Sequence, residues 1–309
     1  MQDKDVSEKL LEAYNDVFAD IVNVFLFGGE RVVREEDLED ASPHSMYKMD
    51  GKLHEQERDV SKFWRKEGVT LSLIGLENQS KYERDMPLRV IGYDGAGYRA
   101  QLLGGGGRRY PVISLVLYFG DTPWGRVRTL RDALRMPDTR LEPFFNDYHL
   151  NLFEIAYLTD EQIAMFRSDF KIVAEFFTKT RTDPDYTPSG TELEHVDAVL
   201  KLLSAVTGVD IYEELTELPK GGKPKTMFEA IRIRDERNIA RGEARGEARG
   251  RAVGRAEGRA EGEARGLARG RIMTYAEFGT PTDEIAARVG LPREEVERIM
   301  REVGIAPRR

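Results

Sequence analysis

The stretch YPVISLVLYFG, residues 110–120, constrains the fold more than any other part of the chain. It is an unbroken run of β-branched, aliphatic and aromatic residues, which is typical of a strand that is buried on both faces. Such a strand needs neighbouring strands at its edges and helices over both of its faces. We therefore expect a mixed α/β fold with this strand inside the sheet.

The residues before this strand supply its expected partners. Residues 3–27 have apolar side chains at helical spacing and stop at a glycine pair, so they predict a helix. Segments 54–64 and 69–79 have the character of two strands joined by a tight turn. Residues 86–103 predict a second helix. The order helix, hairpin, helix, strand indicates a mixed sheet flanked by helices.

The rest of the chain changes character twice. After a charged, irregular segment at 31–45 and the core described above, helical signals dominate, most clearly at 160–178 and 193–206, and residues 149–158 are compatible with one more strand. We divide the chain into four regions: a core at 1–125, a helical extension packed on it at 126–235, a four-residue-repeat arm at 236–272, and a helix-turn-helix-like module at 273–309.

The arm has a glycine at every fourth position, eight times from Gly242 to Gly270. An interior glycine costs a helix roughly 1 kcal/mol relative to alanine, so eight cost on the order of 8 kcal/mol. We therefore expect a flexible or partly helical tether. A self-association segment, in which glycines allow helices to approach closely, is the alternative. The density of charge excludes pairing of such helices inside a membrane.

The last region predicts two short helices. A small residue, a turn glycine and a core aliphatic residue stand where a helix-turn-helix has them: Ala286, Gly290 and Val296. The second helix would present arginines together with carboxylates, and carboxylates that face phosphates are unfavourable. We therefore favour a packing or assembly module over a DNA-reading module.

Composition limits the chemistry. The chain has no cysteine, which excludes disulfides, thiolate zinc sites and thiol nucleophiles. The four histidines lie far apart in sequence and show no metal-ligand spacing. Any metal is then expected to have oxygen ligands, which favours magnesium, manganese or calcium.

Charge and hydropathy limit the partners. The net charge is −8, but residues 237–271 carry ten Arg against five Glu and residues 272–309 carry six Arg against seven acids, which leaves residues 1–236 at −12. An acidic body with a basic arm is unlike a protein that coats nucleic acid. No apolar run is long enough for a membrane span, and the first residues are polar and acidic, unlike a signal peptide. We expect a cytoplasmic protein with no membrane contact.

The stretch LSLIGLENQS, residues 71–80, ends an apolar strand with Glu77 and Gln79 on one face. A three-residue turn after Lys66 would pair the two strands so that Asp59 lies opposite Glu77, with Cβ atoms about 4.5–5.5 Å apart. A two-residue turn would place the two carboxylates on opposite faces. We expect the three-residue turn.

Two carboxylates this close repel each other unless a cation lies between them. A hard cation held there can polarise a scissile phosphate and lower the pKa of an attacking water. A polar side chain two residues after the glutamate can position that water. The pattern therefore indicates metal-dependent hydrolysis of phosphodiester bonds.

These segments, together with ERDVSKFW, GYDGAGY and YPVISLVLYFG, resemble the Rpn family of recombination-promoting nucleases, which are also described as transposase-like. The resemblance covers roughly residues 1 to 235. It implies the PD-(D/E)XK superfamily, with a restriction-endonuclease-like fold, bound Mg²⁺ or Mn²⁺, and DNA as the substrate.

The resemblance also implies roles for single residues. Asp59 and Glu77 match the metal-binding carboxylates, and the backbone carbonyl of Asn78 matches a further ligand. Gln79 stands where many superfamily members have lysine, although the Rpn family commonly has glutamine there. It can orient water but supplies no positive charge.

Other polar residues admit two interpretations. Arg89 and Tyr93 are spaced as neighbours on one helix face, and they either contact phosphate or support the site, as the family suggests, or are a packing pair. The first helix adds three acids, of which one is a candidate for the metal and most are expected in solvent: Glu8, Glu12 and Asp16.

The sequence thus predicts a metal-dependent DNA endonuclease linked to recombination, transposition or defence. Two alternatives belong to other classes: a non-catalytic DNA-binding protein that retains the nuclease fold, and a self-assembling scaffold organised by the glycine-repeat arm. A homo-oligomer is expected because of that arm.

Overall fold

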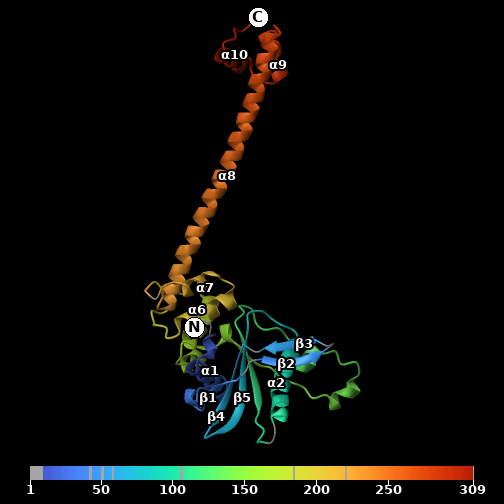
Figure 1. Cartoon of the computed structure of the whole chain (residues 1–309), viewed down its shortest axis with the longest axis vertical. Helices are drawn as coiled ribbons and strands as arrows, with labels where there is room; N and C mark the ends of the chain where they lie inside the picture. The colour runs from blue at the N-terminus through green and yellow to red at the C-terminus, as the bar shows by residue number, and fades with distance from the viewer. Residues whose placement is uncertain are drawn as a thin grey trace. The chain divides into compact units, whose positions relative to one another are not determined.

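The computed structural model describes residues 10–41, 44–49, 52–57, 59–104, 107–183, 185–219 and 221–308, with backbone alone at 44–49 and 52–57. The chain divides into two compact units, Met1–Asp235 and Glu236–Arg309. The first unit combines a mixed sheet with helices, which confirms the α/β class predicted from the sequence (Figure 1).

Five strands form the main sheet, in the spatial order β1 (Leu38–Asp40), β4 (Val60–Lys66), β5 (Val69–Gln79), β6 (Val112–Tyr118) and β7 (Asn151–Glu154). The pairs β1–β4 and β4–β5 are antiparallel, whereas β5–β6 and β6–β7 are parallel. The strand predicted at 110–120 is β6, and it lies between two neighbours. Leu115 and Val116, on its opposite faces, are both fully buried, as predicted for an interior strand.

Helices cover both faces of this sheet. Helix α1 (Asn15–Phe27) packs with the face of β5 that carries Ile74 and Leu76. Helix α2 (Met86–Leu103) packs on the opposite face, in the cluster that contains Val116 of β6. Because side chains alternate along β5, Asn78 shares the α1 face, and Glu77 and Gln79 share the α2 face.

The predicted first helix differs from the structure. Residues 3–9 lie outside the described part of the chain. Leu11–Ala13 form a short 3-10 turn, η1, and the extended backbone of Tyr14, with φ −75° and ψ 133°, separates it from α1. The break changes the helical phase, so that both Leu11 and Glu12 are buried.

The strand expected at 54–64 is also divided. Its first part is β3 (Lys52–Glu57), which pairs with β2 (His44–Met49) in a separate two-stranded sheet. Strand β4 begins only at Val60, so Asp59 lies just before it. The segment expected to be irregular, 31–45, contains a 3-10 turn η2 (Glu35–Asp37), β1 and the start of β2.

The turn between β4 and β5 has two residues, contrary to the expected three. Glu67 and Gly68 have φ values of 51° and 77°, and Lys66 pairs with Val69. Positive φ at both central residues suits the twist of a two-residue hairpin. A β-bulge next to Trp64 then shifts the register by one residue, so that Val60 pairs with Leu76. Continued by one residue, this register places Asp59 across from Glu77.

The helical extension contains α3 (Leu130–Ala133), η3 (Thr139–Phe144), η4 (Ile155–Tyr157), α4 (Asp160–Met165), α5 (Phe170–Thr182), α6 (Val196–Thr207) and α7 (Ile211–Thr216). The single helix expected at 160–178 is therefore two helices. At the break, the backbone N–H groups of Arg167 and Ser168 donate to the Asp20 carboxylate of α1, at 2.7 and 2.8 Å. These hydrogen bonds replace helical ones and stabilise the break.

The glycine-repeat segment is part of one continuous helix, α8 (Met227–Glu277). The expectation of a flexible or partly helical segment is therefore wrong. Between Gly242 and Gly270 each repeat glycine faces open space, with nothing within 4 Å of an added Cβ. The Ala, Arg and Glu residues between the glycines are good helix formers, and Glu247 and Arg251 form an ion pair one turn apart.

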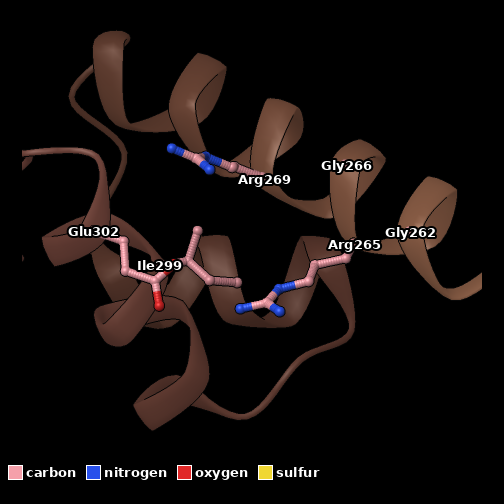
Figure 2. A pocket seen from close by; sticks show the side chains of 6 residues that line it. All are labelled: Gly262, Arg265, Gly266, Arg269, Ile299 and Glu302. Carbon is pink, nitrogen blue, oxygen red and sulfur yellow. The ribbon is translucent and has the colours of Figure 1, made fainter.

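The second unit has a core of its own. The end of α8 packs with α9 (Thr282–Val289) and α10 (Arg293–Glu302) around Ile272, Ile285, Val296, Ile299 and Met300. Gly290, with φ 72°, makes the turn between the two short helices that the sequence predicted. A pocket of about 310 Å³ lies between α8 and α10, beside this core (Figure 2). It is lined by Gly262, Arg265, Gly266, Arg269, Ile299 and Glu302.

No helix in the described part of the chain combines the length and the apolar character that crossing a membrane requires.

Candidate functional site

The polar end of β5 meets α2 through four side chains. Glu77 is 4% exposed and accepts a hydrogen bond from the amide of Gln79 at 3.2 Å. Arg89 of α2 forms an ion pair with the same Glu77 oxygen, Oε1, and donates to the Tyr93 hydroxyl at 3.0 Å. The structure therefore brings together four of the six residues proposed from the sequence, all on the α2 face of the sheet.

Asp59 and Asn78 meet at the edge of β5 that faces β4. The Asp59 carboxylate accepts the backbone N–H of Asn78 at 2.6 Å. The next carbonyl, that of Gln79, accepts the N–H of Phe119 on the β6 side. Because successive peptide groups of a strand point to opposite edges, the Asn78 carbonyl is directed toward the Asp59 side. This is the orientation that the proposed metal ligand requires.

Glu12 is the residue that the sequence interpretation underestimated. It was one of three acids expected to lie mostly in solvent, yet it is fully buried. It lies close to both Asp59 and the Asn78 side chain, on the α1 face of the sheet. The sequence interpretation missed the burial of Glu12 because it extended the helical pattern through Tyr14, where the structure has a break. Of the other two acids, Glu8 lies outside the described residues and Asp16 is half-exposed.

Burial and charge set the protonation of this cluster. Burial and, to a smaller extent, the nearby Asp59 charge raise the pKa of Glu12 to about 7, against opposing contributions from its own backbone and from Asn78. Burial and the charge of Glu77 raise the pKa of Tyr93, so its hydroxyl remains protonated near neutral pH. The Asp59 carboxylate contributes to both shifts, so its charge acts on Glu12 and on Tyr93 alike.

The buried oxygens here suit a hard cation. Both carboxylate oxygens of Glu12 and the side-chain oxygen of Asn78 are buried and have no hydrogen-bond partner of ordinary geometry among the described residues. Buried oxygens without donors are costly, and a divalent cation with oxygen ligands would satisfy them. Glu12, Asp59, Glu77 and the Asn78 carbonyl are the groups that could hold it.

The three carboxylates are not already gathered around one point. Within the described part of the chain, the group of acidic or histidine side chains whose ligand atoms all lie within 4.8 Å of one another is a different one, Asp16, Glu194 and His195. Glu77 instead engages Arg89. Binding of a cation by Glu12, Asp59 and Glu77 together would therefore need side-chain movement, with Glu77 turning from the guanidinium.

Arginines of α10, the second of the two short helices, are engaged by carboxylates. Arg293 forms ion pairs with Asp283 and Glu297, and Arg298 pairs with Glu295. These short-range pairs reduce the positive potential of α10, which favours the packing interpretation of this module.

Comparison of the sequence with models of known protein families, and with curated proteins, found no match, and neither did comparison of the structure with solved structures.

Proposed function

We propose that this chain is a divalent-metal-dependent DNA endonuclease of the Rpn type, with a restriction-endonuclease-like core. The observation that carries the proposal is the convergence of Glu12, Asp59 and Asn78 beside Glu77 at the end of β5. The buried oxygens of Glu12 and Asn78, which have no hydrogen-bond partner of ordinary geometry among the described residues, support a cation there.

The strand arrangement also supports the proposal. An antiparallel hairpin, β4–β5, is followed by a helix, α2, and by a strand parallel to β5. This order agrees with the core expected from the Rpn resemblance. The two-stranded sheet β2–β3 and the helical extension are additions to it.

Each polar residue then has a role. Bound Mg²⁺ or Mn²⁺ would supply Lewis acidity toward the scissile phosphate and lower the pKa of the attacking water. The Gln79 amide, next to Glu77, orients that water through its oxygen or its N–H. Arg89 supplies the positive charge that a lysine at position 79 would have given, and Tyr93 holds the guanidinium in place.

A second candidate function rests on the ion pair between Glu77 and Arg89. If that pair persists when divalent cations are present, Glu77 is not a metal ligand. The core then acts as a DNA-binding or assembly platform without turnover. The glutamine at position 79, where many nucleases have lysine, agrees with this candidate.

An assay of supercoiled plasmid cleavage distinguishes the endonuclease from the non-catalytic candidate. We expect the full chain to convert the plasmid to nicked and linear DNA with Mg²⁺ or Mn²⁺, and Glu77→Gln and Glu12→Gln to lower the rate by about 100-fold or more. Glu213→Gln, at an exposed position of α7, is the matched control and should cleave like wild type. If wild type is inactive on single-stranded, linear and supercoiled DNA with several metals, the endonuclease proposal is wrong. Filter binding of the same DNA then tests the second candidate.

A further inference from the structure

A second group of metal-ligand side chains lies in the first unit, away from the end of β5. Asp16 near the start of α1, Glu194 and His195 just before α6 each offer a ligand atom, and these atoms all lie within 4.8 Å of one another. The histidine ring nitrogen Nε2 lies 3.1 Å from each of the Asp16 carboxylate oxygens. Glu194 is exposed and Asp16 and His195 are partly buried, so an ion can reach the group from the Glu194 side.

The distances match those of a small transition-metal site. With bonds of about 2.0–2.2 Å to zinc, neighbouring ligands of a tetrahedral site are roughly 3.3–3.6 Å apart. The observed 3.1 Å separation between His195 and Asp16 is within a small side-chain rotation of that value. One imidazole and two carboxylates leave the fourth position for water.

The surroundings hold the histidine in place. The backbone N–H groups of Glu194 and His195 both donate to the buried Asp169 carboxylate, at 3.1 and 2.6 Å. The ring of Tyr14 stacks on the imidazole, with centroids 3.8 Å apart. His195 is the N-cap residue of α6, but its side chain makes no capping hydrogen bond. Its ring nitrogen Nε2 contacts Asp16 instead. Restricting the ring in this way lowers the entropy cost of binding an ion.

The site opens toward solvent. Asp16 and Glu194 also line a shallow pocket of about 420 Å³, whose other walls include Arg34 and Arg167. This space can accommodate water molecules that complete the coordination.

We propose that Asp16, Glu194 and His195 bind a divalent transition metal ion, for which Zn²⁺ is the probe. The mixture of imidazole and carboxylate ligands favours such an ion over Mg²⁺, which prefers oxygen ligands alone. The bound ion would join Asp16, near the start of α1, to His195, just before α6; these two residues are 179 positions apart in sequence. The proposal does not depend on the endonuclease function, because it involves other residues.

Zinc binding to the full chain tests the proposal directly. After dialysis against a chelator, titration calorimetry with Zn²⁺ should show one site per chain, and His195→Ala should weaken it at least about tenfold. Glu194→Gln changes an exposed side chain, so it removes a ligand without disturbing the core, and it should also weaken binding. The same titration with Mg²⁺ should show no effect of either substitution.

Two controls separate this site from others. His149→Ala removes an exposed histidine elsewhere in the first unit and should leave zinc affinity unchanged. Glu12→Gln alters the end of β5 and should also leave it unchanged. If wild type binds no zinc at about 100 µM, or if His195→Ala and Glu194→Gln bind it as tightly as wild type, the proposal is wrong and the His195–Asp16 contact is an ordinary hydrogen bond.

Discussion

At the scale of single residues, Glu12 is the most consequential side chain. It is fully buried beside another carboxylate, and the raised pKa means that its charged form is unfavourable in the folded protein without metal. Such groups lower stability where they must ionise, and are retained where function needs them. Its burial therefore supports a role at the site and predicts a measurable cost to the fold.

The first prediction concerns stability against pH. The folded pKa of Glu12 is about 7, above the ordinary value of 4.5, so between these values the folded state holds a proton that the unfolded state has lost. Stability of the metal-free protein should then fall as pH rises through this window, by on the order of 3 kcal/mol from this group, and level off above it. Glu12→Gln should remove this loss.

Urea unfolding with a chelator, at intervals from pH 4.5 to 8.5, measures the effect. The fluorescence of Trp64 and Trp124, both in the first unit, reports it. Glu213→Gln, an exposed carboxylate, is the matched control and should retain the wild-type profile. Parallel profiles for wild type and Glu12→Gln would show that the carboxylate is solvated.

How far the sequence determines the site depends on how local each relation is. The shared face of Glu77 and Gln79 follows from strand periodicity alone, and the structure keeps it. The position of Asp59 across from Glu77 was predicted with the wrong turn, and a bulge that no sequence signal marked restored the register. The burial of Glu12 depends on the break at Tyr14, which the helical pattern of the sequence did not indicate. His195 and Asp16 meet only through tertiary packing, which spacing cannot reveal.

At the scale of elements, local patterns predicted the regular pieces and missed the junctions. Helix α2 begins and ends where Pro87 and the following glycines place it, and β6 lies within the predicted apolar run. The break between α4 and α5 was missed because it is stabilised by Asp20, which is distant in sequence. Helix α8 was underestimated because the glycine penalty was given more weight than the helix propensity of the Ala, Arg and Glu residues between the glycines.

Helix α8 gives the second prediction. Gly250 lies in its exposed middle, where an added Cβ meets nothing within 4 Å. Gly250→Ala should therefore stabilise the helix by about 1 kcal/mol, since alanine has the higher helix propensity. Amide hydrogen exchange across residues 242–258 should slow by roughly fivefold.

The same substitution at Gly290 is the matched control. Gly290 has φ 72°, which is unfavourable for alanine, so Gly290→Ala should destabilise the second unit by about 1 kcal/mol. If Gly250→Ala speeds exchange instead, the glycine face of α8 contacts another helix in solution, which is what the self-association alternative requires.

At the scale of the whole molecule, the chain has separate cores in its two units. The cores that cover the main sheet use residues up to Ile233 of α8, whereas the second unit uses Ile272 and the two short helices. The repeat segment between these parts of α8 is exposed and contributes to neither core. Sequence composition indicated a change of region here, but only the structure identifies which apolar residues close the second core.

The last prediction tests whether the second core is independent. Ile299 is 2% exposed in the second unit, so Ile299→Ala should destabilise that unit by about 2–5 kcal/mol through lost burial and a cavity. Ile239→Ala makes the same chemical change at a position of α8 that is 63% exposed, and its effect should stay below about 0.5 kcal/mol. Because both tryptophans lie in the first unit, their fluorescence transition should be the same in both variants and in wild type. Circular dichroism should show an earlier loss of helix in Ile299→Ala alone. A shift of the fluorescence transition in Ile299→Ala would show instead that the two units unfold as one.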